Sequence, residues 1–190
     1  PVELLRDAYG VPHIYAETLA GAGFGLARAQ AEDNLPGILE YFARARGEGA
    51  LALGASAGSI NEDFYTRALH LPEIGRTLYE QTSPKAKALI DAYAAGINLY
   101  LDEHPELRPE WFGRASGQDV VALGKWFQAQ QCLGEAKKDL ARTPAARRET
   151  DTASAGLSAS NMWAVGPGRS SDGSTMLFSD PHLPWSGLTL

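Results

Sequence analysis

Residue patterns that mark several common protein classes are scarce in this chain. No apolar run reaches 18 residues, so no segment is long enough to span a membrane as a helix. Acidic residues outnumber basic ones by 23 to 17, and the net charge of −6 argues against a nucleic-acid partner, which needs clustered Lys and Arg. The local basic run from Arg142 to Arg148 is interrupted by Thr, Pro and Ala, so we interpret it as solvated chain.

Cysteine and clustered histidine are scarce as well. Cys132 is the single cysteine, so no internal disulfide can form, and it lies in the apolar pattern of a predicted helix, where a small buried thiol is expected. The histidines are scattered, and no pair has the i, i+4 spacing of a helical metal site: they are His13, His70, His104 and His182. We therefore predict no cysteine nucleophile and no metal site of this kind.

Two further signatures are missing. The glycine-containing run 21–25 lacks the third glycine of a dinucleotide loop and the Lys-Ser/Thr pair of a phosphate loop, which favours small residues for close helix packing. No Gly-x-Ser-x-Gly elbow occurs, so an α/β-hydrolase triad is not supported. The chain opens at Pro1 without an initiator methionine or a signal peptide, and residues 186–190 have the pattern of a beginning strand. We therefore expect a longer natural gene product.

The hydrophobic pattern predicts helices over most of the first 140 residues. Two short strands are expected first, around a turn at Tyr9-Gly10. The apolar spacing then predicts helices over about 19–34, 36–46, 63–80, 84–101 and 117–140, and loops over 55–62 and 104–115. This part of the chain is expected to be mostly helical.

Particular residues set the ends and contacts of these helices. Ser83 followed by Pro84 is typical of a helix start, and Ser116 with Asp119 three residues later resembles a capping box. Gly96 stands in mid-helix, where it costs about 1 kcal/mol relative to Ala. We therefore expect another backbone to pass close to Gly96.

The pattern changes after residue 140. Residues 141–159 contain one large apolar side chain, Leu157, and bury too little surface to offset their ordering entropy. From Ser160 the pattern becomes that of a strand, with a turn at 171–173 and a second strand from 175. The predicted division is a helical region over 1–140, a spacer over 141–159 and a hairpin within 160–190.

Ser160 stands where the predicted spacer ends and the strand begins. This position suits a serine freed as an N-terminus by chain cleavage, because the new α-amine, with a pKa of about 8, can take the hydroxyl proton itself. Such a nucleophile needs no separate base residue. Position alone favours the other interpretation, an ordinary serine that starts a strand after a loop.

Several stretches, in order along the chain, resemble the penicillin acylase family of N-terminal-nucleophile hydrolases, in its cephalosporin and acyl-homoserine-lactone acylase branch. The first, RDAYGVPHI at 6–14, is similar to the family's opening RD-x-x-GVPHI. Residues 160–166 resemble the start of the family's β chain, and residues 179–183 resemble its (N/D)-P-H-L stretch. His182 in this stretch lies 22 residues after Ser160. The stretches that follow 6–14 are, in order, FG (24–25), AQAEDN (29–34), ARARG (43–47), DAYAAGIN (91–98), SNMWAVG (160–166) and SDPHL (179–183).

The resemblance implies an α+β fold, in which a mostly helical α-chain region precedes the first strands of a four-layer αββα core. It also implies a zymogen that cleaves itself between Ala159 and Ser160, after which Ser160 attacks an amide and His182 orients the nucleophile. Gly often precedes the nucleophile in this family, and Ala159 is still a small residue there. Ser158 is a lesser alternative cleavage point, because it lacks the Asn-x-Trp that follows Ser160.

The same resemblance implies a pocket, partners and a location. Trp126, Phe127 and Gln130 would line the acyl pocket, although core aromatics are as good an interpretation of the first two. Calcium occurs in the family, for which Glu135 is conceivable, and no other cofactor is expected. The implied partners are a small acyl amide and the remainder of the β chain in an αβ heterodimer, in the periplasm or outside the cell. Because the family's oxyanion-hole donors lie beyond residue 190, residues 1–190 alone are expected to be inactive.

A second class of function remains open at the level of sequence. The chain also fits a non-catalytic helical homologue or subunit that binds a partner. Within the enzyme class, cleavage of a β-lactam side chain and cleavage of an acyl-homoserine lactone are not distinguished.

Overall fold

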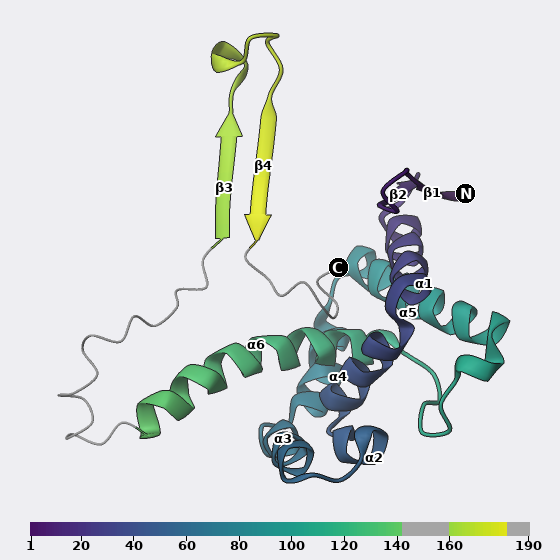
Figure 1. Ribbon diagram of the computed structural model, residues 1–190, viewed down its shortest axis with the longest axis vertical. Helices are drawn as coiled ribbons and strands as arrows, with labels where there is room; N and C mark the ends of the chain where they lie inside the picture. The colour runs from purple at the N-terminus through teal and green to yellow at the C-terminus, as the bar shows by residue number, and fades with distance from the viewer. Residues whose placement is uncertain (142–159, 182–190) are drawn as a thin grey trace. The chain divides into compact units, whose positions relative to one another are not determined.

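The computed structural model describes residues 1–141 and 160–181, and its contacts divide the chain into two units, Pro1–Lys137 and Lys138–Leu190. The described chain is mostly helical, with two separate two-stranded antiparallel sheets (Figure 1). The elements are β1 (Val2–Arg6), β2 (Pro12–Ala16), α1 (Leu19–Arg46), α2 (Gly49–Leu53), α3 (Ala57–Ala68), α4 (Leu71–Gln81), α5 (Pro84–Glu103), the 3-10 turn η1 (Pro105–Leu107), α6 (Gly117–Ala141), β3 (Ser160–Val165), the 3-10 turn η2 (Pro167–Arg169) and β4 (Met176–Pro181).

The N-terminal hairpin packs against the beginning of α1. The predicted strands and their turn are confirmed, with Val2 opposite Ala16 in the antiparallel register. A Cβ on Gly25 would lie 2.6 Å from Ile14 Cγ2 and 3.0 Å from Val2 Cγ1, so only glycine lets the hairpin come this close. A Cβ on Gly23 would lie 2.9 Å from the Leu89 carbonyl oxygen of α5, so the prediction that the glycine run serves close helix packing is confirmed.

Helix α1 is the longest helix described, and it bends where two helices were expected. Asn34 has φ −153° and ψ 54°, which interrupts the helix, and its side-chain Oδ1 accepts a hydrogen bond from the Gly37 amide at 3.2 Å. Pro36 stands in the first turn after this break, where its missing N–H costs nothing. The helix ends at Gly47, whose φ of 68° is a left-handed cap.

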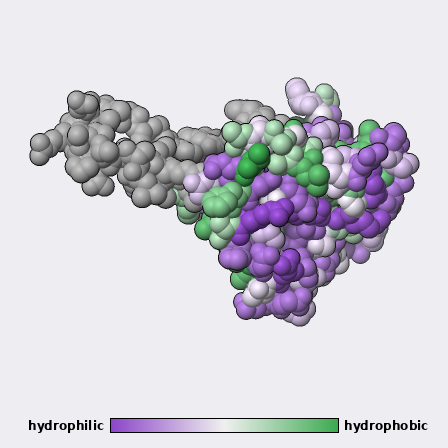
Figure 2. All heavy atoms as spheres, turned by 90° about the horizontal axis from the view of Figure 1, so that it is seen from below, coloured by the Kyte–Doolittle hydropathy of each residue, from purple (hydrophilic) through white to green (hydrophobic). Residues whose placement is uncertain are grey.

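The core of the first unit lies between α1 and α5. Gly96 makes the close approach that the sequence predicts, because a Cβ there would lie 2.7 Å from the Phe24 carbonyl oxygen and 2.8 Å from Ala27 Cβ. The buried side chains are mainly aliphatic, and the largest fully buried ones are Phe42, Phe112, Ile38, Leu39, Ile97, Leu101 and Thr66. Seen from below, the surface is mainly hydrophilic, with patches of hydrophobic side chains (Figure 2).

The single helix expected over 63–80, after a loop at 55–62, is wrong. Helix α3 begins at Ala57, because Ser56 and Ser59 form a capping box in which each hydroxyl accepts the other residue's backbone N–H, at 3.1 and 2.9 Å. The helix stops before His70, which adopts the left-handed conformation with φ 53° and begins α4. Two helices therefore replace one.

Two further expectations concern α6. Its predicted start is confirmed, since Ser116 and Asp119 form the expected reciprocal cap. The expectation of a buried thiol is wrong, because Cys132 is exposed. Within 1–141 and 160–181, no helix is long and apolar enough to cross a membrane.

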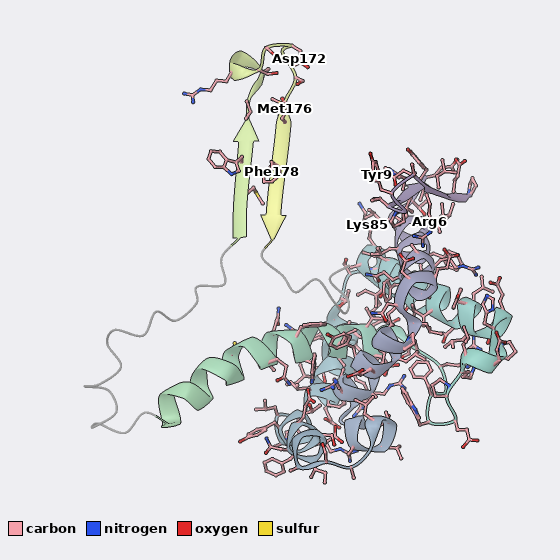
Figure 3. All side chains as sticks on the ribbon, viewed as in Figure 1. Arg6, Tyr9, Lys85, Asp172, Met176 and Phe178 are labelled. Carbon is pink, nitrogen blue, oxygen red and sulfur yellow. The ribbon has the colours of Figure 1, made fainter. Side chains whose placement is uncertain are left out.

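The second unit contains the predicted β-hairpin of β3 and β4. The connection between the strands is longer than a two-residue Asp-Gly turn: it includes η2 and then turns at Gly173, with φ 75°. Asp172 lies at the turn, while Met176 and Phe178 lie along β4 (Figure 3). Both faces of the hairpin carry exposed apolar side chains.

Candidate active site

Ser160 is the first residue of strand β3. It pairs with Pro181, the last residue of β4, and the antiparallel register continues through Asn161 and Asp180 to Val165 and Met176. The residue after Pro181 in the sequence is His182. His182, 22 residues after Ser160, is therefore the residue that directly follows the strand partner of Ser160.

Several of the predicted site residues lie outside the part of the chain that the structure describes. These are Ala159 with the spacer residues 142–158, His182, and the side chain of Ser160; Ala141, where the spacer was expected to begin, is the last residue of α6. Their roles stay predictions.

The turn of the hairpin is held by one carboxylate. Asp172 Oδ1 accepts hydrogen bonds from the Ser174 amide at 3.0 Å, from the Ser174 hydroxyl at 2.7 Å and from the Ser170 hydroxyl. The hydroxyls of Ser170 and Ser174 hold the pKa of Asp172 well below its usual range. This carboxylate therefore organises the turn, and its lowered pKa makes it a poor base.

Helix α6 carries the predicted acyl-pocket residues. Trp126 is 5% exposed, while Phe127 and Gln130 are half-buried. The rings of Trp126 and Phe127 stand nearly perpendicular, with centroids 5.3 Å apart. Among the described residues, the buried indole N–H of Trp126 has no hydrogen-bond partner. The structure therefore places Trp126 in a packed aromatic cluster.

Sequence reasoning missed the third member of this cluster, Tyr41 of α1. Its ring centroid lies 5.7 Å from that of Trp126, in an edge-to-face arrangement, and 5.3 Å from that of Phe127. Such aromatic pairs contribute about 0.5–1.5 kcal/mol beyond the area they bury. No local signal links residues so far apart in sequence, so only the packing of α1 on α6 identifies Tyr41.

A charged pair fixes the start of α6 against the end of α1. Arg46 Nε and Nη2 donate to the two carboxylate oxygens of Asp119 at 2.8 and 2.9 Å, and Nη2 also donates to the Arg114 carbonyl. Burial alone raises the pKa of Asp119, but hydrogen bonds from Arg46 and Ser116 outweigh it and hold that pKa below its usual value. Asp119 thus stays ionised and positions the helix that carries Trp126.

The family-like stretch at 6–14 has a structural role in the described chain. Arg6 joins the N-terminal hairpin to α1 through Glu32 at 3.2 Å and Asp33 at 2.9 Å (Arg6 is labelled in Figure 3). Asp7 accepts backbone N–H groups from Tyr9 and Val11 and so closes the hairpin turn. Together, these residues build the joint between the N-terminal hairpin and α1.

The stretch at 91–98 is likewise structural. Asn98 is buried and bonds the Ala115 backbone twice, at 2.8 Å to the carbonyl and 2.9 Å to the amide. The Tyr93 hydroxyl donates to Gln30 at 2.6 Å, and burial raises the pKa of Tyr93 to about 12. Both residues therefore hold α5 against its neighbours.

A protein metal site needs several ligating side chains around one point. Within the side chains that the structure describes, no group of three or more His, Cys, Asp or Glu is placed to hold a metal ion. The side chain of Glu135, the one position considered for calcium, lies outside them. The expectation about calcium therefore stays a prediction.

Comparisons with known proteins agree with the motifs. The family model for penicillin amidase matches residues 1–190. The chain is 29% identical to the acyl-homoserine lactone acylase PvdQ of Pseudomonas fluorescens, over 97% of this chain and 27% of that protein. It is 26% identical to the acyl-homoserine lactone acylase QuiP of Pseudomonas aeruginosa, over 97% of this chain and 28% of that protein. It is 28% identical to the penicillin acylase 2 proenzyme of a Pseudomonas species, over 96% of this chain and 30% of that protein. The chain thus spans less than a third of the length of these curated relatives.

A solved structure shows the same relationship at the level of fold. The thermostable penicillin G acylase from Alcaligenes faecalis superimposes with a TM-score of 0.60 and 26% sequence identity, covering 69% of this chain and 73% of that chain. The mostly helical α+β fold expected from the sequence is therefore confirmed. On the family model and these likenesses together, the chain belongs to the penicillin amidase family.

Proposed function

We propose that Ser160 is the N-terminal nucleophile of an enzyme that hydrolyses a linear amide bond. The observation that carries this proposal is the hairpin register, in which β3 begins at Ser160 and its partner Pro181 directly precedes His182. Membership of the penicillin amidase family over residues 1–190 supports it. The proposed division of the chain is a helical region over 1–140, a spacer over 141–159 and a β chain from Ser160.

The first proposed step is maturation. The Ser160 hydroxyl oxygen attacks the Ala159 carbonyl carbon, and the peptide C–N bond breaks as the nitrogen takes up a proton. The resulting ester links Ala159 to Ser160, and water hydrolyses it. The products are a carboxylate at Ala159 and a free Ser160 with its α-amine and hydroxyl restored.

The second proposed step uses the same hydroxyl on a substrate. Ser160 Oγ attacks the amide carbonyl, and its proton passes to the α-amine directly or through a water. The proton then moves to the leaving amine as the amide C–N bond breaks, which leaves an acyl-enzyme. Water hydrolyses this ester and regenerates the serine. His182 would orient the nucleophile, and the oxyanion-hole donors would come from the polypeptide beyond residue 190.

The proposed substrates follow from the relatives' names and from the residues on α6. Two named relatives are acyl-homoserine lactone acylases and one is a penicillin acylase. Trp126, Phe127 and Gln130 are the proposed pocket residues, and the apolar character of the first two favours a fatty or aromatic acyl group. The mature enzyme would be an αβ heterodimer in the periplasm or outside the cell.

The test is the state of the bond between Ala159 and Ser160 in the full-length polypeptide. We expect mass spectrometry and N-terminal sequencing to find two chains, one beginning at Ser160. The variant Ser160→Ala should give one uncut, inactive chain, while the control Ser158→Ala should mature normally. A Ser160→Ala protein that is still cut and still releases acid from an amide would show that the nucleophile is another residue.

A substrate panel then separates the two proposed activities. Acyl-homoserine lactones and penicillins of graded side-chain size, scored for released amine, would identify the preferred amide. A mature protein that releases amine from neither class would favour the alternative of a non-catalytic helical homologue that binds a partner.

A further inference from the structure

A small apolar hollow lies between α1, the end of α2 and the connection from α5 to α6. Its volume is about 250 Å³. Leu35 and Leu39, one turn apart on α1 and both buried, contribute to it from the helix. The other lining residues are Pro36, Glu40, Leu53, Leu107, Pro109 and Trp111. All lining residues except Glu40 are apolar, so the hollow suits uncharged, hydrophobic groups.

The hollow is held open by structure on both sides. On one side, the interruption of α1 at Asn34 fixes where Leu35 and Pro36 stand. On the other, Arg108 donates to the Gly113 carbonyl at 2.6 Å and to Asp102 at 2.6 Å, which braces the connection. The site is therefore already formed before a ligand binds, and binding would cost little entropy for ordering the protein.

Phe112 strengthens that second side. It is buried next to Trp111, with the two rings perpendicular and their centroids 5.9 Å apart. Phe112 thus anchors the indole that lines the hollow, and Trp111 offers a fixed aromatic wall. Aromatic walls of this kind pair best with a second ring in an offset or edge-on geometry.

We propose that this hollow is a binding site for one neutral, monocyclic aromatic group. An apolar cavity of about 150 Å³ lined by Leu, Ile and Phe suffices for benzene. The larger volume here holds one ring with a small substituent. The Glu40 carboxylate on the lining is already paired with Arg44, so no free cation of the lining would hold a ligand carboxylate, and its transfer from water into this apolar site is unfavourable.

The probes are fluorobenzene and 4-fluorobenzoate, added to the full chain and followed by fluorine NMR. We expect saturable binding of one fluorobenzene per chain and at least tenfold weaker binding of the benzoate. The variant Leu53→Glu places a charge on the lining and should weaken fluorobenzene binding at least tenfold.

The matched control is Leu51→Glu on the same short helix. Leu51 is 72% exposed and does not line the hollow, whereas Leu53 is 44% exposed and does. Binding in the control should equal that of the wild type. The absence of saturable binding, an equal effect of both substitutions, or equal binding of both probes would overturn the proposal. The measurement needs no turnover, so its outcome is independent of the nucleophile assignment.

Discussion

At the scale of single residues, two buried polar atoms of the described chain lack a hydrogen-bond partner, Thr66 Oγ1 and Trp126 Nε1. A buried hydroxyl without a partner costs about 1–3 kcal/mol of desolvation. Thr66 is fully buried in α3, where valine has nearly the same shape. The threonine hydroxyl is therefore a local weakness that a simple substitution can remove.

We predict that Thr66→Val raises the free energy of unfolding by about 1 kcal/mol, because it removes the unpaired hydroxyl and keeps the shape. Urea unfolding of the full chain measures this. The control is Thr82→Val, since the Thr82 hydroxyl donates to the Leu78 carbonyl at 2.7 Å, and its loss should lower stability. A destabilised Thr66→Val protein would show that this hydroxyl is hydrogen-bonded in solution.

The residues of the candidate site differ in how far the sequence identifies them. Ser160 is identified through family motifs and through its place at a strand start. Trp126 and Phe127 are identified as apolar positions on one helix, but the sequence does not say whether they pack or bind. Tyr41 gives no signal at all, because its role depends on how α1 and α6 meet in three dimensions.

At the scale of elements, glycine positions decide which helices can touch. Gly96→Ala should destabilise the full chain by about 2 kcal/mol, because its Cβ would collide with the Phe24 carbonyl and force α5 away from α1. This effect outweighs the gain of about 1 kcal/mol in helix propensity. Thermal and urea unfolding both report it.

Gly124 in α6 is the matched control. It is exposed, and a Cβ there would meet nothing within 4 Å. Gly124→Ala should therefore stabilise the chain by about 1 kcal/mol through helix propensity alone. Opposite signs for the two substitutions are the expected result, and equal signs would contradict the proposed contact.

The ion pair between α1 and α6 predicts a pH dependence. The pKa of Asp119 is lower in the folded chain than in the unfolded one, so its stabilising effect is present above the unfolded pKa of about 4 and is lost as the pH falls through the folded value. Asp119→Asn should cost about 2–3 kcal/mol near pH 7, because Arg46 is left partly buried without its partner.

Urea midpoints between pH 7 and pH 3 test this prediction. The difference between wild type and Asp119→Asn should be constant above about pH 5 and should shrink below about pH 4. Asp102→Asn, at the more exposed pair with Arg108, should give a smaller difference throughout. A difference for Asp119→Asn that does not change with pH would mean that the carboxylate contributes by packing and not by its charge.

Helix ends were predicted well where their chemistry is local and less well where it is not. Ser83-Pro84 and the pair Ser116 and Asp119 define their helix starts through neighbouring atoms alone, and the structure has both caps. The break before α4 depends on His70 in the left-handed conformation, which glycine adopts most readily. Pro72, the second residue of α4, is the local signal for a new helix start that the sequence prediction missed.

At the scale of the whole molecule, the hairpin of β3 and β4 has apolar side chains on both faces. Met162, Trp163, Met176, Leu177 and Phe178 are each between 49% and 69% exposed. Trp163 pairs with Phe178 on one face, and Leu177 pairs with Ala164 on the other. A two-stranded hairpin is marginal alone, and strands that are apolar on both faces are typical of buried sheets. In the proposed αβ enzyme, the rest of the β chain would cover both faces.

This inference predicts the effect of one substitution on each face of the hairpin. In the full-length polypeptide, Trp163→Ala and Leu177→Ala should each lower the free energy of unfolding by about 2–5 kcal/mol, as expected for buried large side chains. Tyr9→Ala, at the 92% exposed tip of the N-terminal hairpin, is the control and should change stability by less than about 0.5 kcal/mol. Urea unfolding compares the three. If only one of the two hairpin substitutions destabilises the protein, then one face stays open to solvent and the hairpin lies at the molecular surface; if neither does, the remaining polypeptide does not pack on this hairpin.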